Sequence, residues 1–210
     1  MKDSKRARTA LLALAGVRAV LSIVAIPLAP ALYRDHFVVL VLLRPTKEVL
    51  LAAGFLVKQG DVSLGPVLLA AVPLAIVGVW HFYFLGRAYN EEIQTGKGLP
   101  RWASRILPTE QIQKLCKVLE RKGVKVIALG RVAAFPSSLL GAAAGSSDMA
   151  PRPFLVTDFF AGIVSIAEVM VAGYVLGEAY KEAGPWITGV GVAVLLSLLF
   201  LVGRWLKRES

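Results

Sequence analysis

Hydrophobic residues occur along this chain in long runs, and two of these runs are interrupted by charges and proline. Four runs carry few charges and are about 20 residues long, the length at which an α-helix crosses a bilayer. They cover residues 9–30, 64–86, 154–177 and 185–205. This pattern predicts an all-α, multi-pass membrane protein with about four transmembrane helices.

The other two runs, residues 37–57 and 124–148, differ because polar residues stand near their middle. The first contains Arg44-Pro45-Thr46-Lys47-Glu48, and the second contains Arg131 and Pro136. Charges are costly at the centre of a spanning helix, and irregular backbone survives at that depth only inside protein or beside a wet cavity. We therefore predict two re-entrant helical hairpins that meet near the membrane midplane.

The two halves of the sequence repeat each other, without a gap, at a distance of 91 residues. The repeat pairs Pro45 with Pro136, Gly54 with Gly145, Tyr83 with Tyr174, and Gly86 with Gly177. Duplicated apolar units are typical of transporter cores. The hairpin charges do not repeat, because Arg131 corresponds to Leu40. We therefore expect a repeated scaffold with a chemically asymmetric substrate path.

Composition supports the membrane assignment. Of the 210 residues, 56% are hydrophobic and 18% are charged, against roughly 25% charged in soluble domains. The net charge is +10, but the basic residues lie between the apolar runs, which favours membrane topology over nucleic-acid binding. Lys and Arg concentrate at both termini and in residues 88–123, so these parts are predicted to be cytoplasmic in a plasma-membrane protein. The hairpins then enter from opposite faces, which makes the repeat inverted.

The central segment, residues 88–123, contains a predicted amphipathic helix that begins near Pro108 and ends at Gly123. Its apolar positions follow helical spacing: Ile112, Leu115, Val118 and Leu119. Basic residues occupy the other positions, so we expect the helix to lie on the cytoplasmic membrane surface beside anionic headgroups. The first hydrophobic run is predicted to be a retained helix rather than a cleaved signal peptide, because Arg18 interrupts it.

Signals for catalysis are poor in this sequence. It has two histidines and one cysteine, Cys116, without the spacing of metal ligands. The glycines do not form a phosphate-binding loop between a strand and a helix. We expect no enzymatic activity, no cofactor and no metal site.

Several short motifs, taken in order, resemble the DedA family within the superfamily of VTT-domain, or SNARE-associated Golgi, proteins. In the second half they are Gly123, Gly130-Arg131, Pro136, Ala144-Gly145 and Gly173-Tyr174-Val175-Leu176-Gly177. In the first half they are Pro45, Ala53-Gly54 and Tyr83-Phe84-Leu85-Gly86-Arg87. The resemblance covers residues 34–182. Lys47 stands where the family usually has an acid, with Glu48 one position later, and Ser137-Ser138-Leu139 stands where a second arginine is common.

The resemblance implies a flippase or scramblase that moves phospholipids or polyprenyl phosphates between leaflets, in some members with proton coupling. Arg131 matches a family position, and its guanidinium suits a lipid phosphate. The predicted substrate-binding residues are Arg131, Arg44, Pro45, Pro136, Gly54 and Gly145. The predicted proton-coupling acids are Glu48, Glu168 and Asp158. A structural ion pair between Arg131 and Glu48, and a place at the membrane rim for Arg44 and Lys47, are the competing interpretations.

Two other functions remain open at this point. The same scaffold suits a small-ion or proton exchanger, in which the intramembrane acids would carry the coupling ion. A membrane assembly factor that does not transport would instead use the basic central segment. The expected partners are membrane lipids with an anionic or phosphate headgroup and no nucleic acid. A homo-oligomer is possible, because Gly173 and Gly177 permit close helix contact.

Overall fold

The computed structural model describes residues 2–99, 103–133, 135–147 and 149–177. Within these ranges every regular element is a helix, which confirms the all-α prediction. The predicted fourth transmembrane helix, residues 185–205, and the predicted cytoplasmic C-terminus lie outside the described residues.

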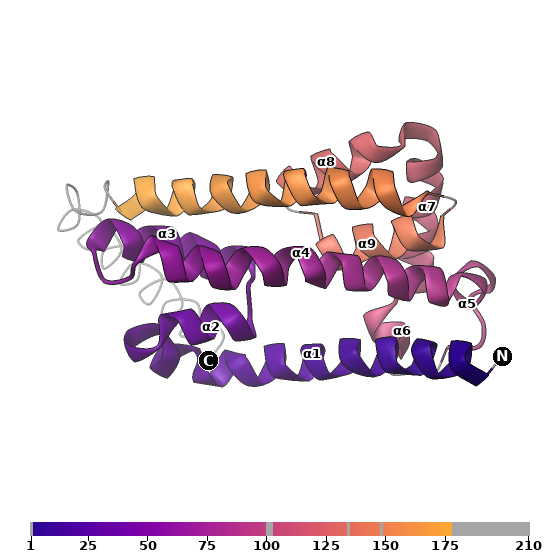
Figure 1. Cartoon of the computed structure of the whole chain (residues 1–210), viewed down its shortest axis with the longest axis horizontal. Helices are drawn as coiled ribbons and strands as arrows, with labels where there is room; N and C mark the ends of the chain where they lie inside the picture. The colour runs from indigo at the N-terminus through magenta and orange to yellow at the C-terminus, as the bar shows by residue number, and fades with distance from the viewer. Residues whose placement is uncertain (1, 100–102, 134, 148, 178–210) are drawn as a thin grey trace, which may run out of the picture.

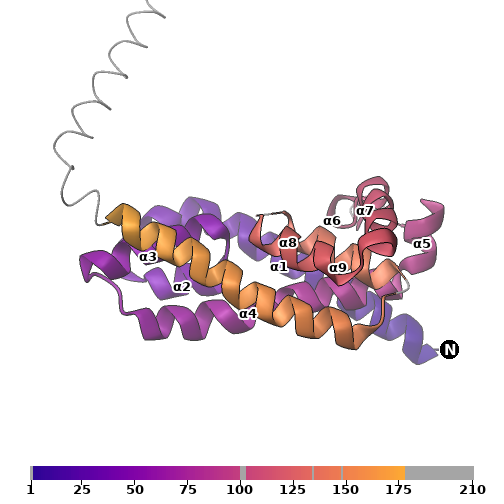
Figure 2. The same cartoon turned by 90° about the horizontal axis from the view of Figure 1, so that it is seen from above.

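Three long helices are apolar enough to cross a membrane. They are α1 (Lys2–Asp35), whose apolar part is Arg6–Tyr33, α4 (Leu64–Ala88), and the helix Pro151–Gly177. These helices contain the predicted runs 9–30, 64–86 and 154–177. In Figures 1 and 2, α4 and Pro151–Gly177 run lengthwise in opposite directions. Helices that correspond in the repeat are therefore antiparallel.

Two further helices are broken at the positions where the sequence places proline. The pair α2 (Phe37–Leu43) and α3 (Lys47–Gln59) is interrupted at residues 44–46, here called the first break. The pair α8 (Val124–Val132) and α9 (Ser137–Ser146) is interrupted between Val132 and Ser137, here called the second break. Proline has no N–H for a helical hydrogen bond and pushes the preceding residue out of the helical region. Arg44 accordingly has φ −146° and ψ 76°.

Glycines allow each broken helix to pack closely against a long helix from the other half of the chain. A Cβ at Gly54 on α3 would collide with the Met170 carbonyl oxygen, and one at Gly145 on α9 would collide with the Tyr83 carbonyl oxygen. Small residues permit this approach of one backbone to another. The two glycines are equivalent in the repeat, whereas their partners are shifted by one helical turn, because Met170 corresponds to Val79. The duplication therefore extends from the sequence to the helix packing, with this shift in register.

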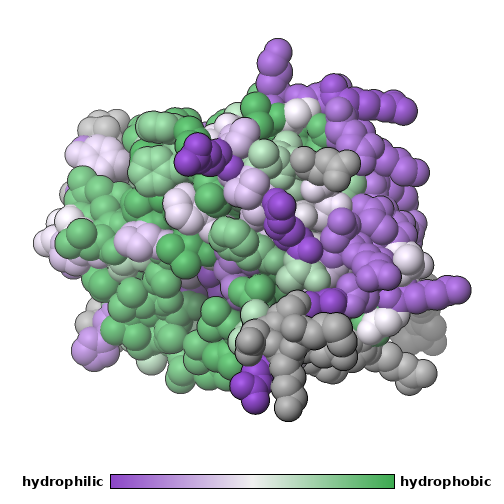
Figure 3. All heavy atoms as spheres, turned by 45° about the vertical axis from the view of Figure 1, so that its right-hand side comes forward, coloured by the Kyte–Doolittle hydropathy of each residue, from purple (hydrophilic) through white to green (hydrophobic). Residues whose placement is uncertain are grey.

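Three short helices lie at the end of the molecule that carries the N-terminus: α5 (Asn90–Thr95), α6 (Ala103–Ile106) and α7 (Thr109–Lys122). Figure 3 shows hydrophilic residues gathered at this end, whereas hydrophobic residues cover most of the rest of the visible face. This division is what a membrane-embedded body with one polar end requires.

The apolar face of α7 differs from its prediction. Ile112, Cys116 and Leu119 are buried, and the Cys116 thiol donates to the Ala143 carbonyl oxygen of α9 at 3.3 Å. Val118 is 41% exposed. The prediction that this face lies on lipid is therefore wrong for its centre, because α9 offers a nearer apolar partner.

Candidate functional site

Lys47 joins the two helix breaks. It does so beside the middle of the helix Pro151–Gly177, where Ser165 donates to the same Arg131 carbonyl oxygen. Lys47, the first residue of α3, donates from Nζ to the Arg131 carbonyl oxygen at 2.9 Å and to the Val132 carbonyl oxygen at 3.3 Å. These carbonyls belong to the last turn of α8, where backbone oxygens lack helical partners and carry partial negative charge. The lysine therefore binds the first break to the end of the second half's broken helix.

The side chain of Arg131 points into the protein and meets an acid. Its Nε lies 3.1 Å from Oδ1 of Asp158, and the two side chains are only 7% and 0% exposed. Nη1 of Arg131 also donates to Ser137 Oγ at 3.0 Å. The Arg131 carbonyl oxygen accepts a further hydrogen bond, at 2.8 Å, from Ser165 Oγ on the helix Pro151–Gly177. We call this centre the Arg131–Asp158 pair.

The Arg131–Asp158 pair has hydrogen-bonding capacity that the described residues do not use. Nη2 of Arg131 and Oδ2 of Asp158 have no hydrogen-bond partner in the described part of the chain. A Cβ at Gly162 would meet the same Nη2, so a larger residue there would require the guanidinium to shift. The indole N–H of Trp80, on α4, lies close to the Asp158 carboxylate. Buried ion pairs with unused donors and acceptors are costly, and they are concentrated at functional sites.

A family model that describes the VTT domain matches residues 45–175. The chain belongs to the VTT-domain family. The matched range contains Pro45 of the first break, Lys47, the second break and the Arg131–Asp158 pair, whereas α1, α2 and Arg44 precede it.

Relatives of this VTT-domain chain are inner membrane proteins of the DedA family. The chain is 30% identical to the inner membrane protein YghB of Escherichia coli (strain K12) over 132 residues, which are 63% of this chain and 58% of the relative. It is 25% identical to the inner membrane protein YqjA of the same strain over 134 residues, which are 64% of this chain and 59% of the relative. The match therefore spans less than two thirds of these relatives. No solved structure matches the chain.

Within this VTT-domain fold, the three predicted acids lie in different environments. Asp158 is fully buried beside Arg131, whereas Glu48 and Glu168 are exposed. The structural pair considered between Arg131 and Glu48 is wrong, because Asp158 is the partner of Arg131. The pairing brings together residues from α8 and the next long helix, which no local pattern relates. The one signal available was that a carboxylate inside an apolar helix needs a buried partner.

The remaining predicted residues fall into two groups, one that lies in the helix breaks and one that lies where helices pack against each other. Arg44 and Pro45 are half-buried in the first break, and Pro136 is exposed in the second. Gly54 and Gly145 instead face the backbone of a neighbouring helix, which leaves no space for a substrate there. Their prediction as substrate ligands is therefore corrected to a packing role. Lys47, which sequence reasoning placed at the membrane rim, is the residue that joins the two breaks.

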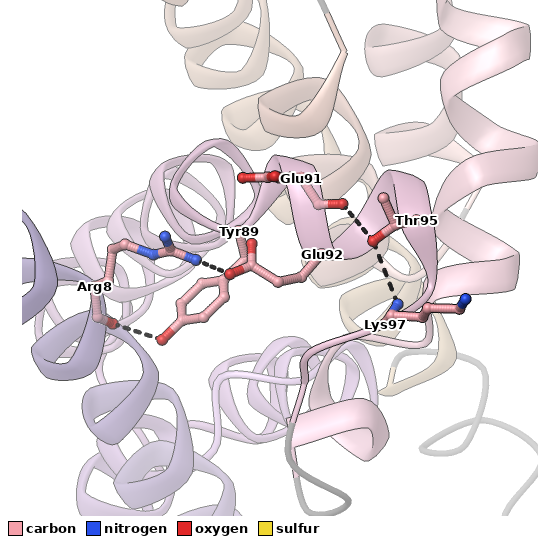
Figure 4. A network of polar contacts seen from close by, with 6 residues as sticks. All are labelled: Arg8, Tyr89, Glu91, Glu92, Thr95 and Lys97. Carbon is pink, nitrogen blue, oxygen red and sulfur yellow. Dashed lines mark hydrogen bonds and ion pairs between the residues drawn. The ribbon is translucent and has the colours of Figure 1, made fainter.

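A second polar network, drawn in Figure 4, lies outside the centre and ties α1 to the rest of the protein. The guanidinium of Arg8 pairs with Glu92 and lies over the Tyr89 ring, 4.6 Å from its centroid. Tyr89 donates from its hydroxyl to the Arg8 carbonyl oxygen at 3.3 Å. On α5, Thr95 Oγ1 donates to the Glu91 carbonyl oxygen at 2.8 Å and accepts from the Lys97 N–H at 3.4 Å. These contacts fix the polar end and leave the Arg131–Asp158 pair untouched.

Proposed function

We propose that this protein moves lipids with a phosphate headgroup between the leaflets of the plasma membrane, as a flippase or scramblase. The observation that carries this proposal is the meeting of two broken helices at a buried arginine–aspartate pair, whose aspartate lies about two turns into the apolar helix Pro151–Gly177. Transporter sites are commonly built where broken helices meet near the midplane. Membership of the DedA family, whose proteins are generally transporter-like, supports the same class.

The broken pairs α2–α3 and α8–α9 are proposed to be re-entrant hairpins that enter from opposite membrane faces. Three features support this arrangement: the apolar sequence of each pair, the proline in each break, and the antiparallel course of the corresponding long helices. The polar end with α5, α6 and α7 would face the cytoplasm together with the N-terminus, following the positive-inside rule. The C-terminus is proposed to lie on the same side.

In the proposed mechanism, Asp158 forms an ion pair with the guanidinium of Arg131 while no lipid is bound. A phosphate can form two parallel hydrogen bonds to a guanidinium, and Nη2 of Arg131 is already unpartnered. A lipid phosphate that binds Arg131 competes with Asp158 and leaves this carboxylate without its counter-charge. An unpaired buried carboxylate gains a proton rather than stay charged. Lipid binding would thus be coupled to proton uptake at Asp158.

The other charged residues extend this proposed path. Arg44, in the first break, would attract the phosphate before it reaches Arg131. Glu48 and Glu168 lie exposed on helices that flank the pair, and they would pass protons between Asp158 and the surroundings. Lys47 would hold the two breaks together while the lipid passes.

The experiment that tests the proposal is reconstitution in liposomes with a fluorescently labelled phospholipid. Arg131→Ala should reduce translocation to the rate of protein-free liposomes, because the phosphate loses its ligand. Lys125→Ala is the matched control, since it removes an exposed positive charge from the same helix, and it should translocate like the unaltered protein. The proposal fails if Arg131→Ala retains the full rate, or if the unaltered protein matches empty liposomes.

A proton or small-ion exchanger is the second candidate, and one observation favours it. Asp158 is the sole fully buried acid in the described part of the chain, as expected for an ion-coupling carboxylate. Flux driven by a pH gradient, measured in liposomes without labelled lipid, separates the two functions. An exchanger dissipates the gradient with no lipid translocation, and Asp158→Asn would stop it.

A further inference from the structure

An apolar crevice lies beside the first break, with Pro45 among the residues that line it. It has a volume of about 280 Å³, close to the lower limit of roughly 300 Å³ for small-molecule sites. Its walls come from α1, the end of α2, Pro45 and α4, and eight of its ten lining residues are apolar. The two exceptions are Arg18, on α1, and His81, on α4. We call this space the Arg18 crevice.

The guanidinium of Arg18 has no anionic partner among the described side chains. Its one hydrogen bond within the described part of the chain is long, from Nη2 to the Leu74 carbonyl oxygen at 3.4 Å. The guanidinium rests against α4 at Gly78, where a Cβ would collide with it. His81, one turn further along α4, has no hydrogen-bond partner at Nε2 within the described residues. The crevice therefore presents a positive charge and a second polar group that the described residues leave unmatched.

The depth of Arg18 makes this unmatched charge costly. Arg18 stands 12 residues after Arg6 and 15 before Tyr33, the two ends of the apolar part of α1. At 1.5 Å per residue these separations are about 18 Å and about 22 Å, so the guanidinium lies well inside a hydrocarbon layer about 30 Å thick. Charges at such depth normally face a cavity or a partner of opposite sign. Here the cavity is present, and the partner has to come from outside the described chain.

We propose that the Arg18 crevice binds an anionic phospholipid, with Arg18 holding the phosphate and an acyl chain lying along the leucine and valine wall. The apolar wall commits the site to a lipid, because a free phosphate would leave those side chains without a partner. The cation selects a lipid with net negative charge, since a zwitterionic headgroup brings a second positive charge close to Arg18. The volume admits the phosphate and part of one chain, while the rest of the lipid stays in the bilayer.

This site is distinct from the Arg131–Asp158 pair, although both adjoin the first break. Pro45 lines the crevice, whereas Lys47, two residues later, bonds to the end of α8. The crevice wall on α1 and α2 also precedes the residues that match the VTT-domain model. A lipid seated there would contact the first break at Pro45. The proposal concerns binding, and it does not depend on whether the protein transports lipid.

Photo-cross-linking tests this proposal at the level of residues. The full chain is placed in phosphatidylcholine vesicles that contain a little phosphatidylglycerol with a photoreactive acyl chain, and labelled peptides are identified by mass spectrometry. We expect labelling next to Leu21 and Val77, which line the crevice on α1 and α4. Unlabelled phosphatidylglycerol should compete with the labelling, whereas phosphatidylcholine and inorganic phosphate should not.

Three variants make the test specific. Arg18→Leu should weaken phosphatidylglycerol competition about tenfold or more, as expected for loss of a hydrogen bond between charged groups. Arg6→Gln removes an exposed positive charge from the same helix and should leave labelling unchanged. Val77→Trp fills the crevice from a position that is 58% exposed, so it should remove labelling without disturbing the fold. Equal competition by phosphatidylcholine or inorganic phosphate, or full labelling of both Arg18→Leu and Val77→Trp, would overturn the proposal.

Discussion

Two glycines that correspond in the repeat lie beside two corresponding tyrosines, and these two regions of the protein differ in how deeply they are buried. Gly145 packs against Tyr83, and Gly54 packs against the backbone at Tyr174, its equivalent in the repeat. Tyr83 is fully buried, donates to the Met149 carbonyl oxygen at 2.8 Å, and stacks on Phe154 with 4.5 Å between ring centroids. Tyr174 is 42% exposed, with Lys58 Nζ 4.8 Å from its ring centroid. The side of the molecule where α9 packs on α4 is thus buried, and we call it the closed half. The side where α3 packs on the helix Pro151–Gly177 is more exposed, and we call it the open half.

The charged residues at the two helix breaks also differ between the two repeats of the sequence. The second break supplies the buried arginine, and the first supplies the lysine that binds its carbonyl oxygen. A duplicated scaffold gives two helix breaks at equivalent prolines, while sequence divergence assigns a different task to each. Residues that both repeats share are therefore expected to stabilise the fold, whereas charges found in one repeat are expected to serve the proposed transport.

The largest expected effect comes from breaking the Arg131–Asp158 pair on one side only. Asp158→Leu leaves a buried guanidinium without its counter-charge, which should cost about 3–5 kcal/mol in the free energy of unfolding. The double variant Arg131→Met with Asp158→Leu should recover most of this loss, because neither charge remains. Denaturation in detergent, followed by circular dichroism, measures both. Equal losses in the single and double variants would show that the two residues are not coupled.

A smaller effect is expected at the glycines that hold the broken helices against the long ones. Gly145→Ala and Gly54→Ala each place a Cβ against backbone atoms that cannot turn away, at a cost of about 1–3 kcal/mol. The closed half should suffer more, since its core leaves less freedom to shift. Gly65→Ala, on α4 with open space around it, is the control and should be nearly neutral. Thermal unfolding would refute the comparison if Gly54→Ala were the more damaging.

The buried tyrosine should contribute more than its exposed equivalent. Tyr83→Phe leaves the Met149 carbonyl oxygen without its donor and should cost about 1–3 kcal/mol. Tyr174→Phe removes an exposed hydroxyl and should stay within about 0.5 kcal/mol of the unaltered protein. Unfolding of both variants under one set of conditions gives the difference. Similar values for the two would mean that the open half is covered in the membrane-embedded protein.

The smallest expected effect is on the rate at which Cys116 is alkylated, and it tests whether the closed half is tightly packed. Burial raises the pKa of the Cys116 thiol, although the nearby Ser146 hydroxyl acts in the opposite direction. A raised pKa leaves less thiolate at any given pH, so alkylation should be slow and its pH profile should move to higher pH than that of an exposed cysteine. Substitution of Leu119 by Ala should loosen α7 from α9 and raise the rate. A profile typical of an exposed thiol in the unaltered protein would show that α7 is not closed over Cys116.

Local sequence pattern predicted the helices and their breaks, because both depend on neighbouring residues. Hydrophobic length gave the long helices, and Pro45 and Pro136 located the interruptions. Repetition of Gly54 as Gly145 signalled a shared role, but that role is backbone contact and not substrate binding. The sequence could not distinguish these uses, since glycine is required in both.

The partners at the candidate site could not be predicted, because they depend on how separate helices align. Arg131 was identified from its place in an apolar hairpin, but Asp158, 27 residues later, meets it only through the register of α8 on the next long helix. The sequence interpretation placed Lys47 at the membrane rim and missed its actual contact. The acceptor is a backbone carbonyl oxygen, which no pattern of side chains reveals. The same reason explains α7, whose apolar face was assigned to lipid and packs on α9.

The most direct test of the account is the rate of lipid translocation in liposomes with and without a pH gradient, for the unaltered protein and Asp158→Asn. If Arg131 exchanges Asp158 for a lipid phosphate, the gradient should change the rate of the unaltered protein. Asp158→Asn, which cannot take up the proton, should translocate at one rate under both conditions. An unaltered protein that matches protein-free liposomes, or an Asp158→Asn variant with the full response to the gradient, would contradict the account.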